Sequence, residues 1–106
     1  MAELKRNLSP SRKRLIELMQ EIHFGRLEGL VVRNGEPVLD AALRVTREVV
    51  FGKDNAAHPA RMLADFELKE PLLELFRFFD RERSMRIESL VLQNGLPVRM
   101  SLAKAV

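Results

Sequence analysis

Few residues of this 106-residue chain are suited to chemistry. The absence of cysteine excludes disulfides, thiolate catalysis and cysteine-based zinc sites. One of its two histidines, His58, lies in a turn-rich loop at residues 52–59 with Lys53, Asp54 and Asn55. These side chains could bind an ion or a small ligand, because loops often carry function. A plain turn explains the same composition, and no three-ligand metal spacing appears.

The other candidates have simpler structural explanations. His23 falls at the end of a predicted helix, where the helix dipole favours a cation. Glu28 and Glu88 each follow an arginine by two residues, which indicates salt bridges on a strand face rather than an acid/base pair. Neither a phosphate-binding glycine loop nor a serine nucleophile motif is present. The sequence therefore predicts no catalytic, cofactor-binding or metal-binding residue, and an enzyme is not expected.

Positive charge is concentrated at the N-terminus. The formal net charge is +3, but residues 1–14 carry five cations against Glu3. This cluster could contact nucleic-acid phosphates, although the chain has no Tyr or Trp for base stacking. A solvated basic tail is the simpler explanation. The predicted nucleic-acid contacts are Lys5, Arg6, Arg12, Lys13 and Arg14.

The composition is that of one soluble globular domain, with 46% hydrophobic and 31% charged residues. No apolar run approaches the ~20 residues of a membrane span, and the charged N-terminus is unlike a signal peptide. We expect no membrane partner and a reducing, cytoplasmic compartment. Residues 1–8 are predicted to be a basic tail, and residues 9–106 a single domain.

Two helices are predicted from capping signals and apolar periodicity. Ser9-Pro10 opens the first helix and Gly25 ends it, with an apolar stripe between them. Glu70-Pro71 opens the second helix, which extends toward residues 80–84. Each helix is followed by a β-rich run that reaches an Asn-Gly pair, the strongest signal for a two-residue hairpin turn.

The segment between the first hairpin turn and the second helix is ambiguous. Residues 37–51 read as one long strand with a bulge or bend around residues 40–42, after which pairing resumes to Phe51. A short helix followed by a strand is the alternative. Alternation of apolar residues at 62–68 predicts a third strand that pairs with residues 43–51.

The chain contains an internal repeat. Residues 26–39 (RLEGLVVRNGEPVL) and 86–99 (RIESLVLQNGLPVR) are identical at eight of fourteen positions. The helices align at residues 15–18 and 72–75, an offset of 57 against 60 for the hairpins, and the repeat units span about residues 9–40 and 69–103. The sequence therefore predicts an α+β fold: an antiparallel sheet of about five strands with two helices on one face, in the order α-β-β-β-α-β-β.

Strict alternation places apolar residues on both faces of the strands. A sheet with one solvated face would show a cleaner pattern, so hydrophobic surface remains after the helices cover one face. Either a loop covers the second face, or copies of the chain pack together there. We expect a homo-oligomer, with a two-fold dimer favoured. The predicted interface residues are Leu30, Val32, Leu73, Phe78, Leu90 and Leu92.

Each repeat resembles a family of short bacterial YezD-like proteins of unknown function. The resemblance rests on Ile22-His23-Phe24-Gly25, a short β run, Asn34-Gly35 and Val38 in the first copy. The second copy has Gln93-Asn94-Gly95 and Val98 but Ser84-Met85 in place of the aromatic-Gly element. The resemblance implies no activity. It suggests two fused units, or single units elsewhere that pair to do what this chain does alone.

The sequence therefore predicts a non-enzymatic, self-associating domain with a structural or protein-interaction role. The alternative is a small nucleic-acid-binding or regulatory protein that uses the basic N-terminus.

Overall fold

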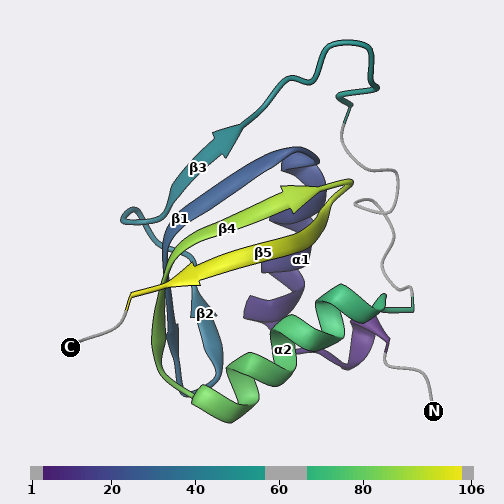
Figure 1. The fold of residues 1–106 in the computed structure, drawn as a ribbon. Coiled ribbons are helices and arrows are strands. Elements are labelled where there is room, and N and C mark those ends of the chain that lie inside the picture. The colour runs from purple at the N-terminus through teal and green to yellow at the C-terminus, as the bar shows by residue number, and fades with distance from the viewer. Residues whose placement is uncertain (1–3, 57–66, 104–106) are drawn as a thin grey trace.

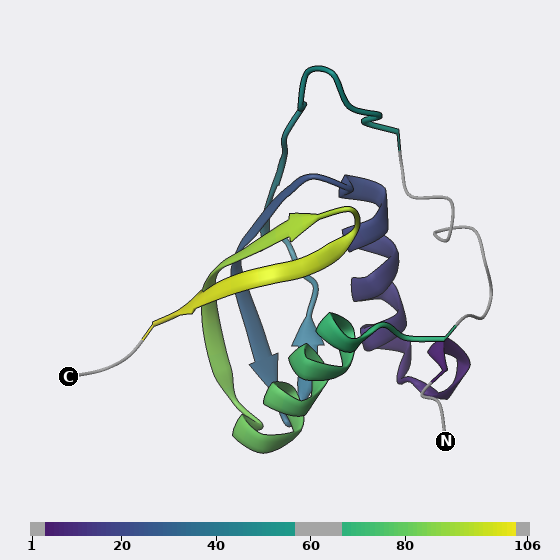
Figure 2. The ribbon, with the colours of Figure 1, turned by 45° about the vertical axis from the view of Figure 1, so that its right-hand side comes forward.

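A computed structural model describes residues 4–56 and 67–103 of the chain. Two helices cover one face of a five-stranded antiparallel sheet (Figures 1 and 2). This confirms the predicted α+β class and the order α-β-β-β-α-β-β. The elements are the 3-10 helix η1 (Lys5–Asn7), α1 (Pro10–Ile22), β1 (Gly25–Arg33), β2 (Glu36–Val38), β3 (Arg44–Arg47), α2 (Glu70–Glu82), β4 (Met85–Gln93) and β5 (Leu96–Leu102).

The helices begin where the sequence predicts, but the predicted end of the first helix at Gly25 was wrong: α1 ends at Ile22, and Gly25 is the first residue of β1. The Ser9 hydroxyl accepts a hydrogen bond from the Arg12 amide at 3.3 Å, which satisfies one free N–H of the first turn of α1. Both helices end at a residue with positive φ, His23 at 67° and Arg83 at 63°. The inward faces form one core with the sheet. The helix residues at its centre are Leu15, Ile16, Met19, Leu72, Leu75, Phe76 and Phe79.

Strands β1 and β4 form the centre of the sheet, whose strand order is β2-β1-β4-β5, with β3 also paired to β1. Both hairpin turns use Asn and Gly with positive φ: 52° and 77° at Asn34 and Gly35, and 55° and 73° at Asn94 and Gly95. These values are those of a type I′ turn, which needs positive φ at both central residues. The Asn-Gly signals therefore fixed both hairpins locally.

The return strand of the first hairpin is interrupted where a bend was predicted. Strand β2 pairs with Val31–Arg33, and β3 pairs with Gly25–Glu28 farther along the same strand. Between them Asp40 closes a turn, because its carboxylate accepts from the Ala42 amide at 3.0 Å and its carbonyl accepts from the Leu43 amide. The prediction was too long at its end, since pairing stops at Arg47 rather than at Phe51.

The third strand predicted at residues 62–68 is not the third strand of the fold, which is β3. Residues 62–66 lie outside the described residues. Leu68 belongs to no strand, and Glu67 forms only an isolated bridge with Leu4.

The two helix-hairpin units correspond at a single offset of sixty residues. The helices begin at Pro10 and Glu70, the central strands at Gly25 and Met85, and the outer strands at Glu36 and Leu96. The offset of 57 predicted for the helices was therefore wrong. A shift of three residues is close to one helical turn of 3.6, so an apolar stripe fits both alignments nearly equally well.

Each hairpin turn is anchored on the helix end of the other unit. The Gly35 amide donates to the Arg83 carbonyl at 2.7 Å, and the Gly95 amide donates to the His23 carbonyl at 2.9 Å. These reciprocal bonds satisfy carbonyls that a helix terminus leaves unpaired. The two units therefore interlock through their turns as well as through the β1–β4 ladder.

Most apolar residues of β1 and β4 face the core, contrary to the strict alternation that was predicted, and Val31 and Val91 are half-buried. Gly29 has φ 76°, and the alternation of β1 is broken there, so Leu27 and Leu30 both face the core. Strand β4 behaves in the same way around Ser89, next to a register shift between Ile87 and Ser89. As a result, four predicted interface residues are core residues with at most 1% of their surface exposed: Leu30, Val32, Leu90 and Leu92.

Candidate interaction surface

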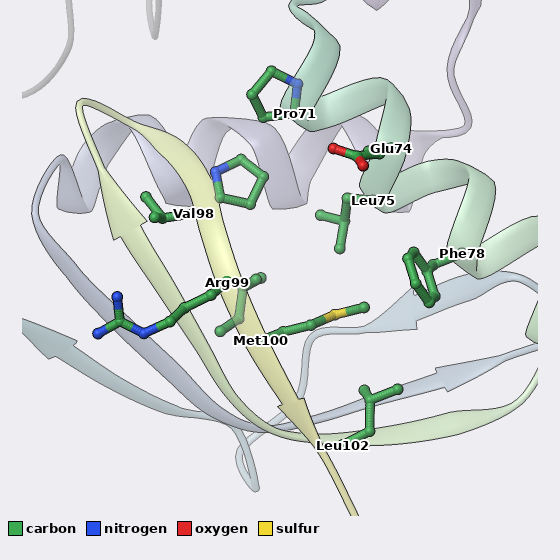
Figure 3. A pocket seen from close by; sticks show the side chains of 10 residues that line it. Pro71, Glu74, Leu75, Phe78, Val98, Arg99, Met100 and Leu102 are labelled. Atoms are coloured by element: carbon green, nitrogen blue, oxygen red, sulfur yellow. The ribbon is translucent and has the colours of Figure 1, made fainter.

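A groove of about 260 Å³ runs between α2 and the outer strand β5 (Figure 3). Helix α2 contributes the Phe78 ring, and β5 contributes the Met100 and Leu102 side chains. Of the two predicted interface residues outside the sheet, Phe78 lines this groove, whereas Leu73 packs partly buried against the core. The full lining is Pro71, Glu74, Leu75, Phe78, Leu90, Pro97, Val98, Arg99, Met100 and Leu102.

Strand β5 is an edge strand with exposed apolar side chains. Among the described strands, it pairs only with β4. Its outer edge therefore offers unpaired backbone N–H and C=O groups, which can bind another strand. Val98 and Leu102 are 49% and 40% exposed along this edge. The unpaired backbone edge of β5 and the apolar groove between β5 and α2 thus lie next to each other.

The equivalent position in the first unit is closed. There the outer strand β2 is only three residues long, and the chain then turns at residues 40–43. Leu39 and Leu43, at the two ends of this turn, pack partly buried against the core. The two units share helix length and hairpin geometry, but only the second presents a long, open edge beside its helix.

Charged side chains flank the groove without filling it. The Arg81 guanidinium lies 4.4 Å from the centre of the Phe78 ring, a cation–π contact that holds this ring at the groove wall. Figure 3 shows Glu74 on the helix side, while the Arg99 side chain leads away from the groove across the sheet. The groove is therefore apolar at its centre with one carboxylate at its rim.

The alternation Val98, Met100, Leu102 was the sequence signal for this surface. It places three apolar residues on one side of an outer strand with polar Arg99 and Ser101 between them. The predicted interface residues lie on β1, β4 and α2 instead, because strict alternation places apolar residues on both faces of the two central strands.

Two residues of the predicted nucleic-acid cluster hold the fold together instead. Lys5 is 3% exposed, with its Nζ atom 3.6 Å from a Glu17 carboxylate oxygen. The Arg12 side chain is 12% exposed, and its Nη2 atom donates to the Gly35 carbonyl at 2.8 Å and to Asp80 at 2.6 Å. Their assignment as phosphate contacts was wrong, because a buried cation with internal partners is not available to an external anion.

The other three basic residues lie nearer the surface. Arg6 and Arg14 are exposed, and Lys13 is half-buried. Residues 4–8, predicted as part of a tail, include η1 and place Leu8 against the core. Within the described chain the ordered domain therefore begins before residue 9.

A polar cluster at the start of α1 joins this helix to the first hairpin. One Glu36 carboxylate oxygen accepts from the hydroxyls of Ser9 at 2.6 Å and Ser11 at 2.5 Å. Partial burial raises the pKa of Glu36, but the hydrogen bonds from Ser11 and Ser9 and the Arg12 charge outweigh this and lower its pKa overall. The carboxylate is therefore held in its ionised form at the helix N-terminus, which favours negative charge.

Replacement of Glu36 by glutamine is expected to lower the free energy of unfolding by about 1 kcal/mol at neutral pH. A carboxylate whose pKa is depressed by folding stabilises the protein above its unfolded-state pKa of about 4.3 and loses this contribution as the pH falls through the lower folded-state pKa. Urea denaturation of both proteins at several pH values would measure the difference. A gap between them that stays constant down to the acid limit would contradict the assignment.

The loop that contains His58 has a structural role in its described part. The Asn55 side chain accepts from the Val50 amide at 2.8 Å and donates to the Val50 and Lys53 carbonyls. His23 Nδ1 lies 2.6 Å from the Ala56 carbonyl oxygen. His58 itself lies outside the described residues. Across residues 4–56 and 67–103, no group of three or more His, Cys, Asp or Glu side chains could hold a metal ion.

Comparisons with known proteins give no further assignment. No model of a protein family, no characterised protein and no solved structure matches the chain. In the described part of the chain, no helix has both the length and the apolarity to cross a membrane. Among the features described above, the β5 edge with its adjoining groove is the one that bears on function.

Proposed function

We propose that this chain is a non-enzymatic, self-associating domain with a structural or protein-interaction role, and that its contact surface is the β5 edge with the adjoining groove. The observation that carries the proposal is the difference between the two units. One unit closes its outer edge with Leu39 and Leu43, whereas the other leaves Val98 and Leu102 exposed along an edge of seven residues. Large apolar surface beside an open edge is typical of an interface.

A second copy of the chain is the occupant that this geometry fits best. Antiparallel pairing of two β5 strands about a two-fold axis would continue the sheet and keep both α2 helices in one layer. The chain already uses such a pairing internally, because β1 and β4 pair reciprocally, Leu27 with Leu90 and Leu30 with Ile87. A two-fold interface is also the commonest kind in homo-oligomers. The dimer would bury the apolar groove centre on both sides at once.

The internal repeat supports the same proposal. The constant offset of sixty residues and the reciprocal Gly35 and Gly95 hydrogen bonds are what fusion of two identical, pairing units would produce. We infer that the chain arose by such a duplication. The resemblance to the short bacterial YezD-like proteins, and the cytoplasmic location expected from a cysteine-free sequence, remain expectations beside it.

The Val98→Glu variant is expected to be monomeric at concentrations at which the unchanged protein is a dimer. A buried, unpaired carboxylate costs several kcal/mol, so the dissociation constant should rise at least about a hundredfold. Size-exclusion chromatography with light scattering would give a mass of 12.2 kDa for the variant and twice that value for the unchanged chain.

The matched control is Val45→Glu, since Val45 is 48% exposed on β3, away from the β5 edge. It should leave the dimer intact. A monomeric unchanged chain at micromolar concentration would refute self-association. A dimer broken by Val45→Glu but not by Val98→Glu would refute this surface.

A further inference from the structure

The face of the sheet away from the helices carries a recess of about 360 Å³ with an excess of positive charge. Three cations and one carboxylate line it, together with the Phe24 ring and the Val91 side chain. The charged residues are Arg26, Lys53, Arg99 and Glu48. We propose that this recess binds a phosphate group of an organic ligand.

The sheet register brings two of the arginines into one row. Arg26 of β1 pairs with Val91 of β4, and Val91 pairs with Arg99 of β5. Directly opposed residues in antiparallel strands share a face, and neighbouring strands are about 4.8 Å apart. Arg26 and Arg99 therefore flank Val91 at about 10 Å between their backbones, so the register places the Arg99 side chain on the face of the recess. Figure 3 shows that Arg99 leads away from the α2 groove, so this use of Arg99 does not compete with the groove.

The third cation is held by a well-formed turn. The Lys53 amide donates to the Val50 carbonyl at 3.2 Å, and the Asn55 side-chain amide donates to the Lys53 carbonyl at 3.0 Å. Arg47 of β3 also donates to the Asn55 carbonyl, at 2.5 Å. The wall of the recess that carries Lys53 is therefore fixed to the sheet, which lowers the entropic cost of placing a cation at the site.

Two of the three cations in the recess, Lys53 and Arg99, are available to bind an anion. Arg26 lies 3.2 Å from both the Glu28 and the Glu48 carboxylates, so this arginine is already neutralised. Lys53 and Arg99 have no carboxylate within ion-pair distance among residues 4–56 and 67–103. A phosphate group carries up to two negative charges and offers oxygens to both an arginine fork and a lysine point charge. The Phe24 ring and Val91 provide an apolar surface beside it for the organic part of the ligand.

The test is a titration of the ¹⁵N-labelled protein, followed by amide NMR shifts, with three probes in turn: inorganic phosphate, adenosine monophosphate and a short single-stranded oligodeoxynucleotide. Binding is expected to move the amides of Arg26, Lys53, Val91 and Arg99. The Lys53→Gln/Arg99→Gln double variant should weaken it at least about tenfold, since it removes the charge-assisted hydrogen bonds of both cations to the phosphate. The matched control is Arg33→Gln/Lys69→Gln, which removes the same charge at exposed positions outside the recess.

The probes distinguish the source of the phosphate. Tighter binding of adenosine monophosphate than of the oligonucleotide would indicate a small phosphorylated ligand. Tighter binding of the oligonucleotide would indicate that the recess binds a nucleic-acid backbone. The proposal is overturned if none of the three probes moves these amides at millimolar concentration. It is equally overturned if binding maps to Arg6 and Arg14, or if both double variants weaken it to the same extent. Self-association can be measured separately by light scattering, so either proposal can fail without the other.

Discussion

Replacing Gly25 by alanine is expected to lower the free energy of unfolding by about 3 kcal/mol and to detach β3 from the sheet. Gly25 has φ 152°, a conformation that L side chains rarely adopt. An added Cβ atom would also collide with the Thr46 carbonyl oxygen and stand 2.9 Å from Ile22 Cγ2. The added Cβ atom of Gly25→Ala would thus cause backbone strain of about 1–3 kcal/mol and also a clash with the paired strand β3. Urea denaturation would measure the loss of stability.

The Gly52→Ala variant separates these two causes. Gly52 also has positive φ, 85°, but an added Cβ atom there would meet nothing within 4 Å. We expect a cost of about 1 kcal/mol for the strained backbone alone. Equal losses in the two variants would show that the approach of β3 to Gly25 is unimportant. Amide exchange at Arg44–Arg47 should accelerate in Gly25→Ala only.

The same contact explains why the aromatic-Gly element appears in one repeat only. β3 passes Gly25 so closely that Arg47 pairs with it. The equivalent residue of the second unit is Met85, which pairs with Val32 of β1. Among the described residues no strand corresponding to β3 follows β5. A side chain is therefore tolerated at position 85 and excluded at position 25.

Replacing Arg12 by alanine is expected to cost about 2–3 kcal/mol, the second large effect. Its guanidinium bridges the first hairpin turn at Gly35 and the second helix at Asp80, and it lies 5.1 Å from the centre of the Phe76 ring. Truncation would leave the Gly35 carbonyl without these donors and open space beside the Phe76 and Phe79 rings. Thermal or urea denaturation would measure the change.

Arg14→Ala is the matched control, because Arg14 lies exposed on the same helix. Its cost should stay within about 0.5 kcal/mol. Arg12→Lys should fall between the two, since a lysine point charge cannot reproduce the arginine fork that reaches Gly35 and Asp80 together. The role assigned to Arg12 would be refuted if Arg12→Ala were as stable as Arg14→Ala.

These two residues show why sequence reasoning misassigned the basic cluster. Arg12, Lys13 and Arg14 are consecutive, and on a helix consecutive residues point about 100° apart. Whether a given arginine meets solvent or the second helix depends on where that helix lies. In α2 the residue equivalent to Arg12 is the buried Leu72. The position is therefore internal in both units, and it is occupied by a cation in the first unit and by an apolar residue in the second.

The expectation of apolar residues on both faces of β1 and β4 failed for a similar reason. A strand read with strict alternation places Leu27 and Leu30 on opposite faces, yet both are buried. Gly29 was visible in the sequence, but a glycine inside a strand marks a bulge, a bend or a close approach without saying which. The conformation of Gly29 in the paired strand, and the helices that cover one face of the sheet, decide that Leu27 and Leu30 lie on the same side.

What the sequence determined by itself was local. Ser9-Pro10 began a helix, and each Asn-Gly pair set a type I′ turn, because these features depend on backbone conformation within a few residues. Element order and fold class followed from them. The tertiary structure alone decided the sixty-residue correspondence of the helices, the burial of Lys5 and Arg12, the open β5 edge and the charged recess. Each of these depends on which distant segments approach one another, and residue type and spacing along the chain do not fix that.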